Sequence, residues 1–138
     1  MEVGERHEIG ILDTNALINL ERLQPAYLPR KALITTVTLA ELSVGPLTAK
    51  SEAIAAERQT HLQMAEADFT PLPFDADAAR AFGRVAASLR QAGRKTSART
   101  YDAMIAAIAL ASDLPIHTCN PDDFAGIDGL EVTAVPVP

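Results

Sequence analysis

The residues best suited to chemistry are carboxylates that stand where an apolar run gives way to a helix. Asp13 ends the first short apolar run, and Glu41 lies one turn into the helix expected after the second. Asp102 opens a very apolar segment, while Asp122 and Asp123 follow a later strand. Buried acids need either raised pKa values or a cation between them. If these acids converge, they therefore predict a cation site.

The neighbours of these acids indicate which cation the site would take. Two carboxylates about 4 Å apart repel by roughly 4 kcal/mol at an effective dielectric of 20. No basic residue in these motifs is placed to neutralise all of them, and the donors are oxygen atoms without His or Cys. Such donors favour Mg²⁺ or Mn²⁺ over Zn²⁺, and Mg²⁺ keeps waters that leave room for a phosphate oxygen. This combination suits phosphodiester hydrolysis. Taken singly, Asp13 or Asp102 could instead stabilise a helix start, worth about 0.3–1 kcal/mol.

The elements that must position these acids alternate along the chain. Alternating strands and helices favour a mostly parallel sheet covered on both faces, here a three-layer α/β/α sandwich in a single domain over 1–138. In such sheets ligands bind at the carboxyl ends of the strands. The pattern predicts strands at 8–13, 32–37, 115–118 and 131–135, an edge strand or connector at 70–74, helices at 16–23, 39–45, 51–68, 75–91 and 101–112, and an acidic turn or short helix at 120–124. Thr14 or Asn15 is expected to cap the first helix, and Thr38 the second.

Composition excludes several classes of protein. The single Cys119 cannot form an internal disulfide, and His7, His61 and His117 are too scattered for a zinc finger. We expect His117 and Cys119 to be packing residues. No apolar run approaches the roughly 18 residues that span a bilayer, so we expect a soluble, cytoplasmic protein without membrane contact.

The charge is unevenly distributed. The 138 residues carry a formal net charge of −6, but no acid lies between Asp77 and Asp102, where six of the twelve Lys and Arg residues are found. This stretch carries +6 and the rest of the chain −12. It is either a solvated helix face or a surface for an anionic ligand.

Four segments together resemble a known family. ILDTN at 11–15, TLAEL at 38–42, YDAMIAA at 101–107 and HTCNPDDFAGI at 117–127 are similar, in order and spacing, to the motifs of PIN-domain endoribonucleases, particularly the VapC toxins of bacterial toxin–antitoxin systems. The resemblance covers nearly the whole chain.

The resemblance implies a set of site residues. Asp13, Glu41 and Asp102 match the acidic positions that hold the metal, Mg²⁺ with Mn²⁺ as a substitute, and Glu41 lies nearer the water. Thr14 is implied to hydrogen-bond a site carboxylate. The fourth position departs from the family, which often has an acid where Asn120 stands. Asp123, before Phe124, matches a recurrent Asp-Phe pair, and Asp122 is the third alternative.

The resemblance also implies an activity and partners. The protein would hydrolyse RNA through a water that Glu41 or Asp123 orients, and it would leave 5′-phosphate and 3′-hydroxyl ends. A VapB-like antitoxin would inhibit it by inserting an Arg into the acidic pocket, and a homodimer is expected. We expect an apolar groove for the antitoxin around Leu17, Leu20, Leu39 and Leu42, and RNA-phosphate contacts at Arg90, Arg94, Lys95 and Arg99.

Two other functions compete with this interpretation. A PIN-like module with weakened catalysis, binding only RNA or protein, is compatible with the neutral Asn120. A small-molecule phosphohydrolase or a receiver-like phosphoacceptor could use Asp13. However, Asn15 stands where a haloacid-dehalogenase-type site needs an acid, and the Lys that a receiver needs after a late strand is missing.

Overall fold

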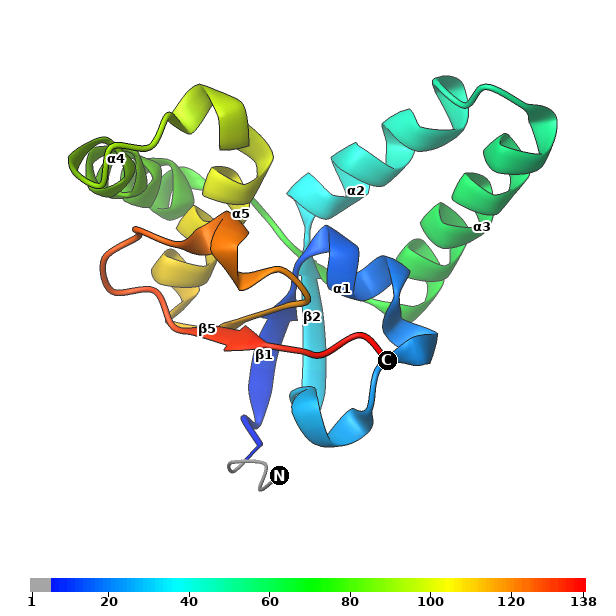
Figure 1. The fold of residues 1–138 in the computed structure, drawn as a ribbon, viewed down its shortest axis with the longest axis horizontal. Helices are drawn as coiled ribbons and strands as arrows, with labels where there is room; N and C mark the ends of the chain where they lie inside the picture. Colours follow the sequence, from blue (N-terminus) through cyan, green and yellow to red (C-terminus); the bar gives the residue numbers. More distant parts are fainter. Residues whose placement is uncertain (1–5) are drawn as a thin grey trace.

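A five-stranded parallel sheet forms the centre of the computed structural model, which describes residues 6–138 (Figure 1). The strand order is β3-β2-β1-β4-β5, and every neighbouring pair is parallel. The strands are β1 (Ile9–Leu12), β2 (Lys31–Thr35), β3 (Pro71–Leu72), β4 (Ile116–Thr118) and β5 (Val132–Ala134). All carboxyl ends therefore lie at one edge of the sheet, where the first strand passes into Asp13.

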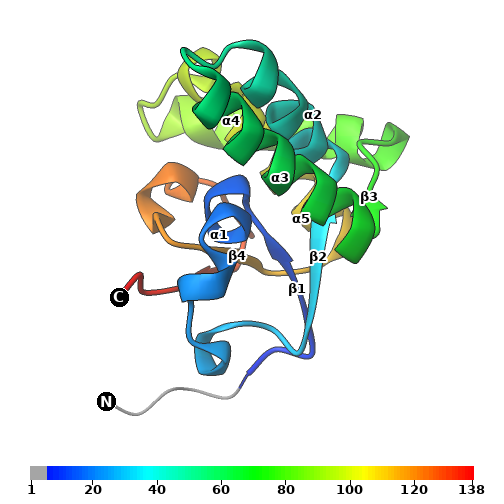
Figure 2. The ribbon, with the colours of Figure 1, turned by 90° about the vertical axis from the view of Figure 1, so that its right-hand side faces the viewer.

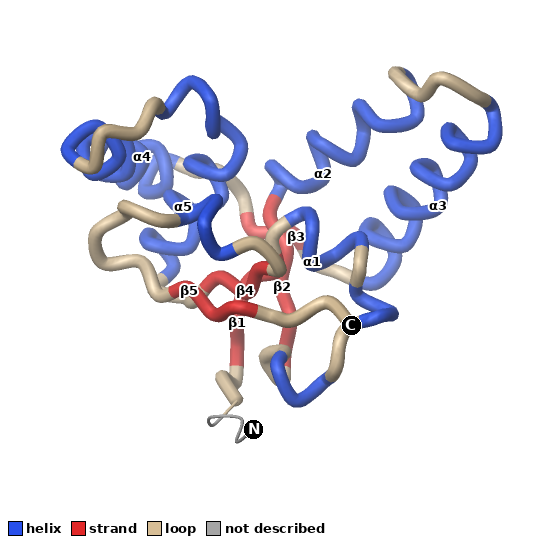
Figure 3. The backbone as a smooth tube through the Cα atoms, viewed as in Figure 1, coloured by secondary structure: helices blue, strands red, loops and turns tan. Residues whose placement is uncertain are grey.

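Helices cover both faces of this sheet. Successive side chains of a strand point to opposite faces, and accordingly Ile11 and Leu12 belong to two different buried clusters. The Ile11 cluster contains α4 (Ala76–Gln91) and α5 (Thr100–Ser112), whereas the Leu12 cluster contains α1 (Thr14–Ile18) with residues of α2 (Thr36–Val44) and α3 (Glu52–Asp68). Figures 2 and 3 show α1 and α3 on one side of the sheet and α4 with α5 on the other. The predicted three-layer sandwich is confirmed.

Two predicted helix caps are wrong. Asp13 caps α1 instead of Thr14 or Asn15: its backbone is extended, and its Oδ1 accepts from the Ala16 N–H at 2.8 Å. The first helix also ends at Ile18 instead of continuing to 23, and a 3₁₀ turn (Leu20–Arg22) follows it. Thr35 caps α2 instead of Thr38, because β2 ends two residues earlier than its β-branched residues suggested.

The other boundaries agree with the pattern to within a few residues. Ser51 and Asp75 cap α3 and α4, and β3 is an edge strand, as its prolines require. The segment 120–124 contains a 3₁₀ turn, η5 (Pro121–Phe124), and a second one, η4 (Thr96–Arg99), lies in the expected basic loop. Among residues 6–138, no helix combines the length and hydrophobicity needed to cross a bilayer.

The apolar groove is lined by two of the four expected residues, Leu17 and Leu20, and not by Leu39 or Leu42. Leu17 and Leu42 are only 1% and 6% exposed and belong to the core, whereas Leu20 and Leu39 are half-buried. A groove of about 280 Å³ opens instead between α1 with its following turn and α3. Its apolar lining is Leu17, Ile18, Leu20 and Met64. Leu42 is buried in the Leu12 cluster, and residues of α3 form the second wall of the groove.

Candidate active site

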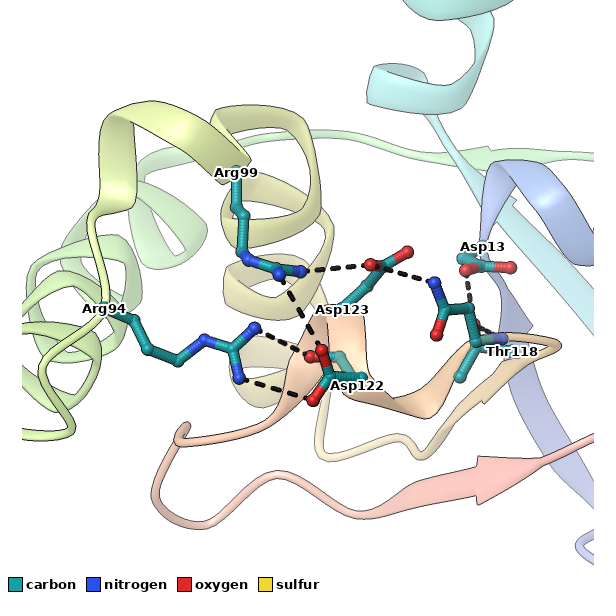
Figure 4. A network of polar contacts seen from close by, with 7 residues as sticks. Asp13, Arg94, Arg99, Thr118, Asp122 and Asp123 are labelled. Carbon is teal, nitrogen blue, oxygen red and sulfur yellow. Dashed lines mark hydrogen bonds and ion pairs between the residues drawn. The ribbon is translucent and has the colours of Figure 1, made fainter.

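Asp13 is held in a fixed position at the carboxyl edge of the sheet. It is 3% exposed, and its two oxygens are used separately: Oδ1 accepts from the Ala16 N–H, and Oδ2 accepts from the Thr118 hydroxyl at 2.6 Å (Figure 4). Burial raises the pKa of Asp13, the two hydrogen bonds lower it, and the charge of Asp123 raises it further. The carboxylate is thus oriented by β4 and by the first turn of α1.

Glu41 approaches the same edge from α2. The Thr14 hydroxyl donates to Glu41 Oε1 at 2.7 Å and, having only one proton, accepts from the Thr38 hydroxyl at 3.0 Å. Burial raises the pKa of Glu41; the Thr14 hydrogen bond lowers it, and the charge of Asp13 raises it. Thr14 therefore orients a carboxylate, as the family resemblance implied, instead of capping a helix.

Asp102 lies in the first turn of α5 and has the most clearly altered acidity. Burial, followed by the charges of Asp123, Glu41 and Asp13, raises the pKa of Asp102 to about 6, while Arg99 opposes the shift. Asp102 is therefore close enough to the carboxylates of Asp13, at the end of β1, of Glu41 and of Asp123 to be affected by their charges. The structure brings Asp13, Glu41, Asp102 and Asp123 together.

The turn η5 separates its two aspartates. Asp123 Oδ1 accepts from Arg99 Nη1 at 3.0 Å and from Asn120 Nδ2 at 3.1 Å (Figure 4). Asp122, with a side chain 74% exposed, turns instead toward Arg94 and Arg99, at 3.6 and 3.8 Å. Asn120 thus contacts Asp123 directly, and Asp122 lies on the side of the basic loop.

The expected RNA-binding residues fall into two groups. Arg94 and Arg99 are half-buried and paired with η5, where Arg94 Nη2 also donates to the Asp122 carbonyl at 3.0 Å. Arg90 and Lys95 are exposed and make no ion pair with any residue of 6–138.

A cavity of about 500 Å³ opens onto Glu41 and Asp102. Its remaining lining is contributed by η4 and the start of α5, and includes Arg99 and Tyr101. Tyr101 was not among the predicted site residues. Its position next to Asp102 was the only signal in the sequence.

The donor set fits a hard cation that keeps part of its water shell. Asp13, Glu41, Asp102 and Asp123 all offer carboxylate oxygens, and the neighbouring Asn120 is neutral. Within residues 6–138, no three His, Cys, Asp or Glu side chains are arranged to hold an ion by themselves. Mg²⁺ commonly binds through one or two carboxylates and several waters, so two of these acids would suffice.

His117 and Cys119 take no part in this group. His117 is 1% exposed, and its ring lies edge-on to the ring of His7, with 5.2 Å between the ring centroids. It packs closely on Gly10: a Cβ atom at that position would lie 2.5 Å from Cε1 of His117. Burial lowers the pKa of His117 to about 4, so its imidazole is neutral at pH 7. Cys119 packs against the Leu12 cluster. Both are packing residues, as expected.

Comparison with known proteins identifies the family. A family model described as "PIN domain" matches residues 10–130. Ribonuclease VapC5 of Mycobacterium tuberculosis is 42% identical over 123 residues, which cover 87% of this chain and 88% of that protein. The chain belongs to the VapC family of PIN-domain proteins. The resemblance drawn from the four motifs is confirmed.

Further VapC relatives and solved structures agree. Ribonuclease VapC of Rickettsia bellii is 30% identical over 131 residues, covering 92% of this chain and 96% of the relative. The VapBC-5 structure from M. tuberculosis matches with a TM-score of 0.82 at 40% identity, covering 93% of this chain and 99% of the matched one. The structure of VapBC2 of Rickettsia felis, bound to a promoter DNA fragment, matches with a TM-score of 0.71 at 24% identity, covering 91% of this chain and 98% of the matched one. At this identity the match supports the fold alone.

Proposed function

We propose that this VapC-family chain is a Mg²⁺-dependent endoribonuclease that acts as the toxin of a toxin–antitoxin pair. The observation that supports the proposal is the group of Asp13, Glu41, Asp102 and Asp123 at the carboxyl edge of the sheet, in which Thr118 orients Asp13 and Thr14 orients Glu41. The relatives named as ribonucleases support the assignment of RNA as substrate. Such a protein acts in the cytoplasm, where its RNA is found.

In the proposed mechanism each carboxylate has its own task. Asp13 and Asp102 would hold the ion, and Asp13 is oriented for this by Thr118 and the Ala16 N–H. A bound Mg²⁺ supplies Lewis acidity toward a phosphate and stabilises its developing negative charge. Glu41, held by Thr14 and with a raised pKa, orients the attacking water and accepts its proton. The products would carry 5′-phosphate and 3′-hydroxyl ends.

Asp123 is the alternative residue for orienting the water. Its charge raises the pKa of both Asp13 and Asp102, which supports a position beside them. Arg99 and Asn120 both donate to its Oδ1, so this oxygen is occupied, and only Oδ2 is available to a water. We propose that Asn120 positions Asp123 and that Asp122 holds the basic loop.

We also propose a VapB-like antitoxin and a second copy of the chain as partners. The matched structures include VapBC complexes. The groove between α1 and α3 lies beside exposed Ile18, and further exposed apolar side chains follow at Val44, Leu47 and Ile54. These apolar positions suit an amphipathic helix of a partner. An Arg of the antitoxin could pair with a carboxylate of the acidic group.

The decisive experiment is RNA cleavage by the purified protein with Mg²⁺ or with a chelator. Cleavage with Mg²⁺ that stops on chelation, and is absent in Asp102→Asn, supports the proposal. RNA binding without cleavage would favour a weakened binding module. Hydrolysis of a small phosphomonoester without RNA cleavage would favour a phosphohydrolase. Co-purification with the product of an adjacent small gene, with suppressed cleavage, tests the toxin role.

A further inference from the structure

One wall of the cavity beside the carboxylates differs in chemistry from the other. Glu41 and Asp102 form the acidic wall, and the segment 97–101 contributes hydroxyls, a guanidinium and an aromatic ring without any acid. The volume of about 500 Å³ lies within the range of small-molecule sites. The cavity can therefore hold a group larger than a phosphate and a few waters.

Tyr101 is the unusual residue of this wall. It stands in the first turn of α5, a helix that is otherwise largely buried, yet it is 50% exposed. Neither aromatic ring pair found within residues 6–138 includes it. A partly exposed aromatic side chain beside a nucleic-acid site can serve as a stacking platform, because every base has a π-face.

The groups around Tyr101 favour a nucleotide over a protein side chain. Arg99 adds a positive charge, and the Thr100 hydroxyl donates to backbone carbonyls, so its oxygen is free to accept. The other exposed apolar side chains that suit a partner helix lie on α1, α2, η3 (Gly45–Leu47) and α3, and none of them lines this cavity. Sequence-specific RNA recognition uses unpaired bases that stack on aromatic rings and are hydrogen-bonded at their edges.

We infer that this cavity is a base subsite, in which Tyr101 stacks on an unpaired nucleobase next to the phosphate that faces Glu41 and Asp102. Tyr101 is then a specificity-determining residue, and the polar groups of the same wall lie at the base edge. The inference rests on the proposed RNA cleavage. The start of α5 then has two roles, because Asp102 faces the phosphate and Tyr101 faces the base.

The test combines removal of the ring with removal of the base. Single-stranded oligoribonucleotides with one cleavage site are compared with versions that lack a single base, scanned across the positions flanking that site. For the wild type, loss of one particular base should lower kcat/KM by roughly tenfold, as expected for one stacked base. Tyr101→Ala should have a similarly lower kcat/KM on the intact substrate. On the substrate that lacks this base, its kcat/KM should fall no further. Tyr101→Phe, the matched control, keeps the ring and should behave as the wild type.

Two results overturn the inference while the nuclease function stands. The first is unchanged cleavage by Tyr101→Ala. The second is an equal loss on intact and base-lacking substrates, which would show that the ring acts through the structure of the site. If cleavage is unchanged and antitoxin binding is weakened, Tyr101 is a protein contact instead. If the wild type cleaves no RNA, the proposed function itself fails, so the two failures are distinguishable. Thermal unfolding of each variant controls for folding.

Discussion

At the scale of residues, the balance of charges explains which acids need a cation. Arg94 and Arg99 face Asp122 and Asp123, so this group is neutral as a whole. The other three acids, Asp13, Glu41 and Asp102, make no ion pair with any residue in the described part of the chain, 6–138. In addition to burial, the charge of Asp13 raises the pKa of Glu41, and the charges of Asp123, Glu41 and Asp13 raise the pKa of Asp102. These three are the charges that an ion would compensate.

The first prediction concerns Asp102 and pH in the absence of metal. Its pKa is about 6 in the folded protein against 3.8 in a model peptide, so folding favours the protonated form. The stabilisation is complete below about pH 4 and is lost as the pH rises toward 6. Asp102→Asn, a permanently neutral mimic, should therefore be more stable than the wild type at pH 7 and nearly equal to it at pH 4. Urea unfolding in chelator across this range measures the difference, and a constant difference would contradict the shift.

The second prediction concerns the hydroxyl that holds Asp13. Thr118 Oγ1 donates to Asp13 Oδ2 and accepts from the Asn120 N–H at 3.0 Å. Thr118→Val keeps the shape but leaves both groups without their partner, which should cost about 1–3 kcal/mol of stability and lower cleavage. Thr118→Ser retains the hydroxyl and is the control. Chemical unfolding and RNA cleavage are the measurements. Stability and cleavage of Thr118→Val equal to those of the wild type would show that the hydroxyl is not needed.

At the scale of elements, the site depends on where helices and turns begin. Asp13 is at once the last residue before α1, its N-cap and a candidate ligand. The turns η4 and η5 are joined by Arg99 and Asp123, 24 residues apart, so the basic loop is held against the acidic turn. A substitution that moves one of these turns should therefore also shift the other.

The third prediction separates the paired basic residues from the unpaired ones. Arg90 and Lys95, at the end of α4 and in the basic loop, are exposed and make no ion pair within residues 6–138. If they contact phosphates, replacing both by Ala should reduce the salt slope of single-stranded RNA binding by about 1.4 units. Lys31→Ala with Lys50→Ala removes the same charge from exposed positions outside α4 and the basic loop, and should leave the slope nearly unchanged. Equal effects of the two pairs would indicate that only net charge matters.

At the scale of the whole molecule, folding itself assembles the acidic group. Its members come from the N-cap of α1 and from α2, α5 and η5, and the hydrogen bond from Thr118 to Asp13 joins residues 105 positions apart. The unfolded chain therefore has no comparable site. An ion that binds only the native state must shift the folding equilibrium toward it.

The fourth prediction follows from this assembly. Mg²⁺ at tenfold its Kd should stabilise the wild-type protein by about 1.4 kcal/mol, and the melting temperature should rise with concentration. Asp13→Asn and Asp102→Asn should show a smaller rise, whereas Asp68→Asn, at the exposed end of α3, is a matched control that should respond as the wild type. Thermal unfolding with Mg²⁺ and with chelator measures this. An identical rise in all four proteins would place the ion elsewhere.

The layered fold, the family and the acids that could form a site can all be predicted from the amino-acid sequence. Strand and helix periods are local signals, and the rule that parallel strands end at one edge places Asp13, Glu41 and Asp102 there without coordinates. The four motifs carried the family assignment, which the comparisons confirm.

The hydrogen-bond and ion-pair partners of these residues depend on tertiary contacts that the sequence does not show. Asp122 and Asp123 are adjacent in sequence, yet one turns to the basic loop and the other to the acidic group. The caps Asp13 and Thr35 were missed because a strand's end is set by its pairing, which β-branched residues near the boundary do not reveal. The exposure of Tyr101 likewise depends on which face of α5 the sheet and α4 cover. Local sequence determines the elements, whereas contacts between distant segments depend on how those elements pack.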